Sequence, residues 1–459
     1  MPEPDLPPEE ATSLDQLDLE TCEADLEAPP AAIVRLGGTF ESFRYRNFSL
    51  FWTGAVISNV GTWMQNTALA IVVYGLRRSA FDVGLMNFLM GIPVLFLALP
   101  AGLLADRIDR RRLIIATQWA LLVQAAALGY LYMIGALSAP HVVTGLAWIC
   151  ALSLAGGIGT ALTFPAWQAM LPDLVPRKSL LNGIALNSAQ FQSSRMIGPI
   201  VAVGLLAVGA GMGGIFYINA ISFLFVIAAL WAIRPRTEDA KVLDAGAERH
   251  EGGWRTITAG IAYARRDRVV GLLLVSTVFV TLFGMPYITL LPAIVDRTLG
   301  IHDAGTTKAA YALAFAIVMA ANGLGAIVGS LGVASLPVTV VRERLMTFFL
   351  LGFAALEIVY ALTRSYVALA AVAALAGAAL LATNSLTNTS IQATVPDRLR
   401  GRVMALFVLC FLGVMPLSAI VFGALGDVIG PSNAVLGGAI VLAVWAAFLV
   451  ARPSLLRRE

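Results

Sequence analysis

Residues Ala434 to Val450 read AVLGGAIVLAVWAAFLV and include no charged side chain. An α-helix rises about 1.5 Å per residue, so roughly 20 apolar helical residues cross the ~30 Å hydrocarbon core of a bilayer. Leu345 to Leu362 is apolar in the same continuous way, except for Glu357. The strands of a membrane barrel would instead alternate polar and apolar residues over segments of about ten. Both stretches therefore predict membrane-spanning helices.

The whole chain has the composition of a membrane protein. Of its 459 residues, 58% are apolar and 13% are charged, whereas a soluble domain has roughly half and a quarter. This composition, with repeated long apolar runs, predicts an all-α polytopic membrane protein with twelve transmembrane helices. The expected spans lie near residues 48–75, 81–104, 113–136, 142–164, 180–206, 213–233, 269–295, 309–333, 345–362, 366–388, 401–424 and 432–451.

A polar stretch at residues 234–268 separates the first six spans from the last six. It predicts two six-helix halves, at residues 39–233 and 269–459, joined by a cytoplasmic linker. Apolar residues mixed with basic ones in the linker favour an interfacial amphipathic helix, and a plain solvated helix explains the pattern equally well. These apolar residues are Trp254, Ile257, Ile261 and Tyr263.

The N-terminal segment differs in kind from the rest of the chain. Residues Met1 to Pro30 hold ten acidic side chains, several prolines and no Lys or Arg. Such a segment buries too little apolar surface to fold, so we expect residues 1–38 to form a disordered acidic cytoplasmic tail. It lacks the basic region and apolar core of a secretory signal, so the first span is expected to act as an uncleaved anchor.

Basic residues are distributed unequally between the two sets of expected loops. With both termini inside, 25 of the 31 Lys and Arg residues lie on the inward side and five on the outward side, with Arg195 inside a span. Cytoplasmic loops of membrane proteins carry this excess. The distribution predicts a multi-pass protein with both termini in the cytoplasm.

A short repeat relates the two halves. Gln168 to Asp173 reads QAMLPD and Gln392 to Asp397 reads QATVPD, and each follows an apolar span and precedes a basic loop. Matching segments at the same step of two six-span halves indicate an internal duplication. Duplicated halves predict a carrier that rocks around a site near the middle of the bilayer.

Gly102 to Arg112 reads GLLADRIDRRR, between the second and third expected spans. This stretch resembles the loop signature of the major facilitator superfamily, G-x-L-A-D-R-x-G-R-R. Asp109 stands where the pattern has glycine, so the turn there uses a residue less tolerant of positive φ. The resemblance implies a conformational latch, in which Asp106 accepts hydrogen bonds from the start of the eleventh span near Gly401. A plain positive-inside anchor is the alternative. The latch residues would be Gly102, Asp106, Arg107 and Arg110.

The region from Phe43 to Val450 resembles the bacterial subgroup that includes enterobactin exporters and macrolide efflux proteins. The likeness is clearest in FRYRNFSLFWTG at Phe43 to Gly54 and VPDRLRGRV at Val395 to Val403. It implies a secondary active exporter of a small amphipathic compound, such as a siderophore or hydrophobic drug, in the bacterial inner membrane. Proton antiport and a monomeric state are implied as well. An importer, a phospholipid flippase or a non-transporting membrane sensor of the same fold are the alternatives.

Arg195 lies near the middle of the fifth expected span, where an unpaired charge costs at least about 2.5–3.5 kcal/mol. With Phe191 and Gln192 on the same helical face, it could present a cation, an aromatic ring and an amide to an anionic or carbonyl-rich substrate. Pairing within the helix bundle is the alternative. Gly198 and Pro199 complete R-x-x-G-P, which is similar to the antiporter motif of span five, although packing explains the two residues equally well.

Polar and aromatic residues within the spans predict an amphipathic substrate cavity, although amides in spans more often bridge helices than bind ligands. Glu357 is the carboxylate deepest in a span, which makes it the formal candidate for proton coupling; a neutral passenger that faces lipid, or a contact between helices, is the alternative. The further cavity candidates are Asn59, Gln65, Asn66, Phe279, Phe283, Tyr287, Asn322, Asn384 and Asn388.

The sequence lacks patterns for other chemistries. None of its three lysines follows the glycine of a GxxxxGK[ST] phosphate loop, so an ATP-driven engine is not expected. The three histidines fall in expected loops, and the three cysteines have no CxxC spacing. We therefore expect neither an enzyme nor a cofactor, metal site or nucleic-acid partner.

Overall fold

The structure is a computed structural model that describes residues 40–138, 141–176, 179–233, 253–299, 308–336 and 341–456. The helices discussed below belong to one unit, Ser42–Glu459. The expected tail at residues 1–38 and the first part of the linker lie outside the described residues. Within the described ranges the chain is helical and has no β-strand, which confirms the all-α prediction.

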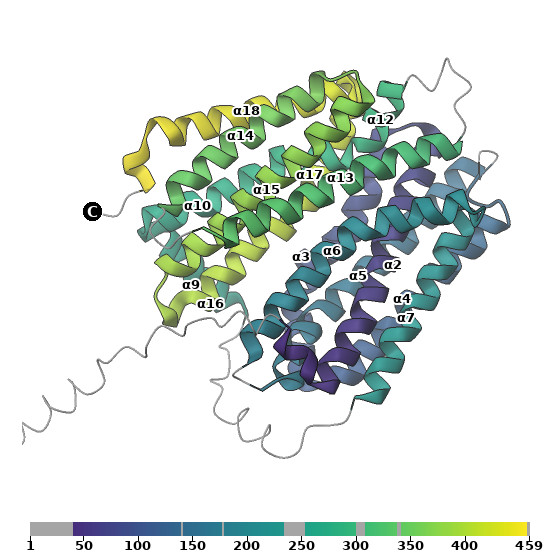
Figure 1. Cartoon of the computed structure of the whole chain (residues 1–459), viewed down its shortest axis with the longest axis horizontal. Helices are drawn as coiled ribbons and strands as arrows, with labels where there is room; N and C mark the ends of the chain where they lie inside the picture. The colour runs from purple at the N-terminus through teal and green to yellow at the C-terminus, as the bar shows by residue number, and fades with distance from the viewer. Residues whose placement is uncertain are drawn as a thin grey trace, which may run out of the picture. The chain divides into compact units, whose positions relative to one another are not determined.

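The first half of the chain forms six long helices that match the first six expected spans (Figure 1). They are α2 (Arg46–Arg77), α3 (Ala80–Arg107), α4 (Arg110–Met133), α5 (Val142–Leu174), α6 (Leu180–Ala207) and α7 (Gly211–Ala232). Local caps set the starts of α3 and α4. The hydroxyl oxygen of Ser79 accepts a hydrogen bond from Asp82 N at 3.1 Å, and Asp109 Oδ1 accepts one from Arg112 N at 2.8 Å.

The Asp109 cap explains the departure from the superfamily pattern. Asp109 has a φ of −51°, so the turn between α3 and α4 needs no left-handed residue at this position. Aspartate favours a helix N-cap because its carboxylate satisfies a free backbone N–H. The turn is therefore made by a capping side chain instead of a flexible glycine.

The second half contains the remaining six expected spans. Four of them are single helices: α13 (Lys308–Ala334), α14 (Arg342–Leu362), α15 (Tyr366–Thr394) and α18 (Pro431–Ala451). The seventh and eleventh spans are broken. The seventh comprises α10 (Arg268–Phe279), a π-helical turn (Val280–Gly284), α11 (Pro286–Thr289) and α12 (Leu291–Leu299); the eleventh comprises α16 (Asp397–Val408), a π-helical turn (Leu409–Gly413) and α17 (Met415–Ile429).

Proline explains where these two spans break. Pro286 and Pro416 stand at the start of the segment after each π-helical turn, and proline has no N–H for the carbonyl four residues earlier. The carbonyl freed by Pro286 is that of Leu282, and it accepts a hydrogen bond from Ser418 Oγ at 2.8 Å. The spans expected at 269–295 and 401–424 are therefore present but interrupted, and the two breaks contact each other.

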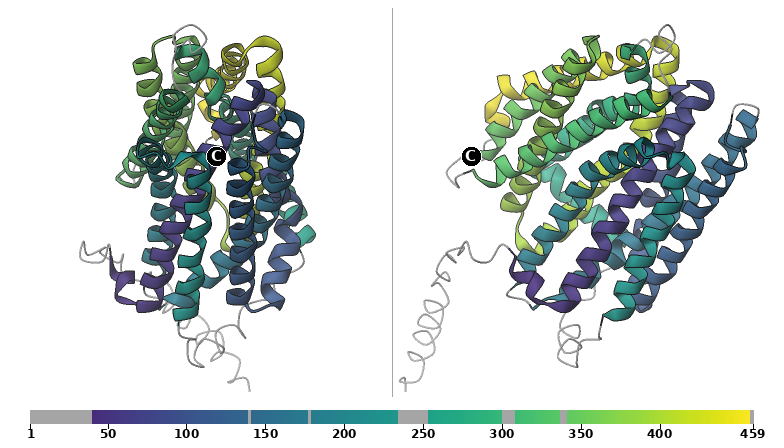
Figure 2. Two further views of the ribbon diagram at one scale, coloured as in Figure 1. Left: turned by 90° about the vertical axis from the view of Figure 1, so that its right-hand side faces the viewer. Right: turned by 45° about the vertical axis from the view of Figure 1, so that its right-hand side comes forward.

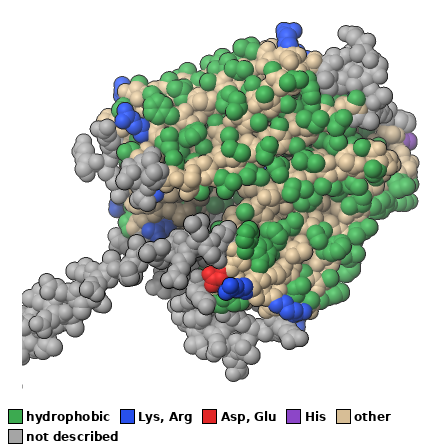
Figure 3. Space-filling view, in the orientation of Figure 1, with side chains coloured by type: hydrophobic (Ala, Val, Ile, Leu, Met, Phe, Trp, Pro, Cys, Tyr) green, Lys and Arg blue, Asp and Glu red, His purple; other side chains and the backbone are tan. Residues whose placement is uncertain are grey.

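Ten helical stretches of the described residues are long and apolar enough to cross a membrane. The two other expected spans, α2 and α6, are long enough but carry more polar side chains, among them Gln65 and Arg195. Figure 3 shows hydrophobic side chains over the broad face of the bundle and Lys and Arg at its margins. Because lipid does not solvate polar groups, the polar faces of α2 and α6 must point toward protein or water.

The helices form two groups, α2–α7 and α10–α18 (Figures 1 and 2). Between the groups, α3 packs on α17 and α6 packs on α13. Glycines allow these close approaches: a Cβ atom at Gly84 would lie 2.3 Å from the Ala419 carbonyl oxygen, and one at Gly323 would lie 2.9 Å from Met196 Cα. Figure 3 also shows a hollow between the groups near the end that carries α16.

A further helix, α9 (Gly253–Arg266), lies in the expected linker and packs on α16. A Cβ atom at Gly260 would approach the Arg402 carbonyl oxygen to 2.9 Å, and Ile261 and Tyr263 pack against the core of the second half. The side chains of Trp254 and Ile257 lie outside those that the structure describes. A helix is thus present where the sequence predicts one.

Candidate functional site

Arg195 on α6 lies beside an aromatic pair between α2 and α6. Its guanidinium carbon is 5.5 Å from the centroid of the Trp63 ring, and Phe191 meets Trp63 edge to face at 6.0 Å. Arg195 is half-buried and makes no ion pair with the described residues. A cation on an aromatic face with free N–H groups is suited to an anionic or oxygen-rich ligand.

Gly198 explains why Trp63 and Arg195 meet. A Cβ atom at Gly198 would lie 2.5 Å from Trp63 Cβ and 2.8 Å from Met64 N. Any larger residue would therefore separate α2 from α6 at the level of the aromatic pair. This contact supports the packing explanation of the R-x-x-G-P sequence. Trp63 itself was not predicted, although it lies one helical turn from Asn59 and Asn66.

Tyr287 and Asn322 of the second half lie close to Arg195. Met196, next to Arg195, contacts Gly323, next to Asn322. Asn322 Nδ2 donates to the Tyr287 hydroxyl at 2.6 Å and to the Ala373 carbonyl at 3.0 Å, and Tyr287 lies near Arg195. The cavity candidates Arg195, Tyr287 and Asn322 thus come together, although they lie on three separate spans.

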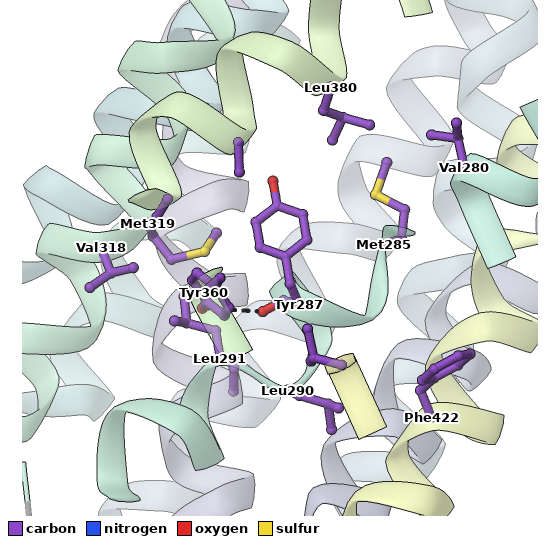
Figure 4. Close-up of a cluster of buried hydrophobic side chains, with 14 of the residues drawn as sticks. Val280, Met285, Tyr287, Leu290, Leu291, Val318, Met319, Tyr360, Leu380 and Phe422 are labelled. Carbon is purple, nitrogen blue, oxygen red and sulfur yellow. Dashed lines mark hydrogen bonds between the residues drawn. The ribbon is translucent and has the colours of Figure 1, made fainter. Parts of the chain in front are cut away.

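Tyr287 is held by the broken seventh span and is 2% exposed. Figure 4 shows its ring among buried side chains of several helices, including Met319 and Leu380. The Tyr360 hydroxyl donates to the Tyr287 backbone carbonyl at 3.4 Å, which fixes the short α11 segment against α14.

Two predicted cavity amides belong instead to a network inside the first half. Asn59 Nδ2 donates to Gln190 Oε1 at 3.1 Å, and Gln65 Nε2 donates to Gln124 Oε1 at 3.3 Å. Asn219 Nδ2 donates to Gln65 Oε1 at 2.8 Å. These bonds connect α2 with α4, α6 and α7, so Asn59 and Gln65 act as helix contacts. Their partner amides were missed because nothing in the sequence pairs amides that lie on separate spans.

The other predicted residues divide into packed and free groups. Phe279 stacks on Trp445 at 4.6 Å and Phe283 meets Phe422 edge to face at 6.2 Å, both within the second half. Asn388 Oδ1 accepts a hydrogen bond from Gln392 at 2.8 Å. Three half-buried side chains make no side-chain hydrogen bond with the described residues and remain available to a substrate: Asn66, Gln192 and Asn384.

Glu357 points into the bundle. Its side chain is 0% exposed, on the same face of α14 as Phe353 and Tyr360. A lipid-facing carboxyl does not fit this position, whereas the alternative of a contact between helices does.

The predicted latch is described only in part. Gly102 is described only as part of α3, and the side chains of Asp106 and Arg107 lie outside those that the structure describes. Arg110 Nη1 donates to the Ala169 carbonyl at 3.0 Å and pairs with Asp173 at 3.4 Å, so it joins α4 to the end of α5 within the first half. Arg110 therefore connects two helices of the first half, and neither of these contacts involves the second half.

The halves are joined by polar contacts at the end of the bundle where α2 ends and α3 begins. Asp427 of α17 accepts hydrogen bonds from Ala80 N and Phe81 N at the start of α3. Asp296 of α12 accepts a hydrogen bond from the Tyr74 hydroxyl at 3.0 Å and pairs with Arg78 at 3.6 Å. Sequence reasoning missed these contacts because they pair residues more than 200 positions apart.

Comparison with solved structures supports the same fold. A nucleoside transporter, NupG, superimposes with a TM-score of 0.66 at 14% identity, covering 90% of this chain and all of NupG. A bacterial homologue of the iron transporter ferroportin in an inward-facing state superimposes with a TM-score of 0.63 at 13% identity, covering 89% of this chain and 99% of that one.

Sequence comparison identifies the family. The staphyloferrin A transporter of Staphylococcus aureus is 24% identical over 383 residues, which cover 83% of this chain and 89% of the relative. A Na⁺, Li⁺, K⁺/H⁺ antiporter of Planococcus maritimus is 26% identical over 219 residues, 46% of this chain and 47% of the relative. Residues 37–457 match the family model described as transmembrane secretion effector. The chain therefore belongs to the transmembrane secretion effector family of the major facilitator superfamily and is a multi-pass membrane transporter, not an enzyme.

Proposed function

We propose that this transporter exports a small amphipathic compound with an anionic or oxygen-rich group, in exchange for protons. Arg195 carries this proposal, because it is a cation without an ion pair among the described residues, placed beside Trp63 and Phe191 between polar helices. The aromatic rings suit an apolar part of the substrate and the guanidinium suits its anionic part. The likeness to a staphyloferrin A transporter agrees with a siderophore-like substrate.

The proposed orientation places both termini in the cytoplasm of a bacterial inner membrane. The excess of Lys and Arg in the corresponding loops supports it. In this orientation the contacts of Asp427 and Asp296 close the outer end, and the hollow near α16 opens inward. The substrate would then enter from the cytoplasm and reach Arg195 between the halves.

Efflux from cells tests the proposal. Efflux-deficient cells that express the protein are loaded with ethidium, erythromycin or enterobactin, and accumulation is measured with and without a protonophore. Expression should lower the accumulation of at least one compound, and the protonophore should abolish this effect. If Arg195 binds the anionic group, Arg195→Ala loses the effect for enterobactin while the protein still reaches the membrane.

A matched control separates the site from general charge effects. Arg364 is exposed in the loop after α14, so Arg364→Ala should export normally. Accumulation that stays equal with and without expression for every compound, at confirmed membrane levels, would contradict export. Uptake assays and lipid labelling would then test the importer and flippase alternatives.

A further inference from the structure

Glu357 is a buried carboxyl group without a partner. Its side chain is 0% exposed, and neither of its oxygens has a hydrogen-bond partner among the described residues. An unpaired carboxylate removed from water is so unfavourable that such a group takes up a proton and becomes neutral. The position of Glu357 therefore favours the neutral acid over the carboxylate.

The surroundings of Glu357 contain few other ionisable groups. The packed neighbours of α14 are α15, α18, the π-helical turn Val280–Gly284 and the turn Pro453–Leu456. Of these, α15 contributes Tyr366 at its first residue and the others contribute no ionisable side chain. Arg342, Glu343 and Arg344 lie at the far end of α14, about 20 Å away at 1.5 Å per residue. Tyr287 and Tyr360 are within electrostatic reach.

These two tyrosines connect Glu357 to the substrate site. The Tyr360 hydroxyl donates to the Tyr287 backbone carbonyl, the two rings meet edge to face at 5.5 Å, and the Tyr287 hydroxyl accepts from Asn322. Tyr287 also lies near Arg195. Tyr287 thus lies in the neighbourhood of both Glu357 and Arg195.

The break in the seventh span gives this connection a means of moving. Gly284 packs directly on Phe353, one turn before Glu357, because a Cβ atom there would lie 2.6 Å from Phe353 Cε1. π-Helical turns and proline breaks are common at functional sites and in the discontinuous helices of transporters. A shift of Tyr287 with this segment would open a path for a proton between Glu357 and the space around Arg195.

We propose that Glu357 is the proton-binding site of this transporter, and that Tyr360 and Tyr287 connect it to the substrate site at Arg195. When the seventh span shifts, the O–H bond of the acid breaks, the proton passes to a water molecule between the halves, and a carboxylate remains. No electron transfer is involved. The inference rests on the proposed proton-coupled transport and names the residue that performs the coupling.

Infrared spectroscopy of the full-length protein in liposomes tests the site without a substrate. The wild type should show a carbonyl band of a protonated carboxyl group that changes between acidic and alkaline buffer. Glu357→Gln should lose this band, whereas Glu343→Gln at the start of the same helix should keep it. Glutamine has the shape of a neutral carboxyl group, so the variant should fold. A titrating band that persists in Glu357→Gln would overturn the proposal.

Flux measurements test the coupling. Ethidium, erythromycin and enterobactin are assayed in the same liposomes, under an imposed pH gradient and as exchange at equal pH. Glu357→Gln should lose the response to the pH gradient and keep the exchange at equal pH. Tyr360→Phe should slow gradient-driven transport more than it slows the exchange. Gradient-driven transport by Glu357→Gln equal to the wild type would overturn the inference. If the wild type itself transports none of the three compounds, the proposed function fails, while the infrared result still decides whether Glu357 binds the proton.

Discussion

Asp427 on α17 accepts a hydrogen bond from the backbone N–H of Ala80, the first residue of α3, with an N···O distance of 2.6 Å. Phe81 N–H and the Ser79 hydroxyl bond to the same carboxylate. A carboxylate of the second half thus caps a helix of the first half, where free amides carry partial positive charge. Asp106, at the other end of α3, is expected to cap the start of the eleventh span. The pair formed by α3 and the eleventh span would then have one carboxylate cap at each end.

Asp427→Asn should weaken the closed end of the bundle. The amide retains hydrogen-bonding capacity but loses the charge, a loss of about 1–2 kcal/mol, which shifts the balance of conformations roughly 5- to 30-fold toward opening at this end. Spin labels at Val208, after α6, and Val367, in the first turn of α15, report the distance between the halves there. The variant should increase the population with the longer distance.

Asp109→Asn is the matched control for this experiment. Asp109 caps α4 within the first half, and asparagine is an equally good cap. The control should leave the distance distribution unchanged. A distribution in Asp427→Asn that matches the wild type would show that the carboxylate cap does not hold this end closed.

Gly84→Ala should also favour opening at the end of the bundle that holds Asp427, because it overpacks the contact between α3 and α17. The added Cβ atom would lie 2.3 Å from the Ala419 carbonyl oxygen, which is backbone and cannot rotate away. Overpacking of this kind costs about 1–3 kcal/mol in the conformation that contains the contact. The same pair of spin labels should therefore report opening. Gly75→Ala, where nothing lies within 4 Å, should not change the distance.

The positions of the helices were predictable because each span is a long apolar run between polar breaks. Ala434 to Val450 lies inside α18, and Leu345 to Leu362 lies inside α14. The breaks in the seventh and eleventh spans were not predicted, although Pro286 and Pro416 mark them. Proline within a membrane helix is compatible with a bend or a π-helical turn, and the choice depends on partners such as Ser418, which lies on another span.

Part of the candidate site was predictable for a similar reason. Arg195 stands out because a lone charge in an apolar helix is costly. Its neighbours Trp63 and Tyr287 depend on how α2, α6 and the broken span pack, which hydrophobic patterning does not specify. The same limit explains why Asn59 and Gln65 looked like ligand groups: an amide that bridges helices and one that faces a cavity have the same sequence pattern.

The amide network of the first half should stabilise the fold. Gln65→Leu removes the hydrogen bonds of Gln124 Oε1 and Asn219 Nδ2 to Gln65, and each buried atom left unsatisfied costs about 1–3 kcal/mol. The midpoint of thermal unfolding in detergent should fall. Asn66→Leu is the control, because Asn66 makes no side-chain hydrogen bond with the described residues. Equal midpoints for the two variants would contradict a stabilising role for the network.

Trp63 should contribute to substrate affinity through Arg195. The guanidinium carbon lies 5.5 Å from the ring centroid, and a cation–π contact contributes about 0.5–2 kcal/mol. This contact is local to the arginine, so its loss should weaken binding of an anionic compound more than it slows the conformational change. Trp63→Leu should therefore raise the apparent KM for enterobactin about 2- to 30-fold, with a smaller change in maximal rate.

Trp119→Leu serves as control, because Trp119 is 42% exposed on the outer face of α4. A KM that changes equally in both variants, or a loss confined to maximal rate in Trp63→Leu, would show that Trp63 does not act on the substrate through Arg195.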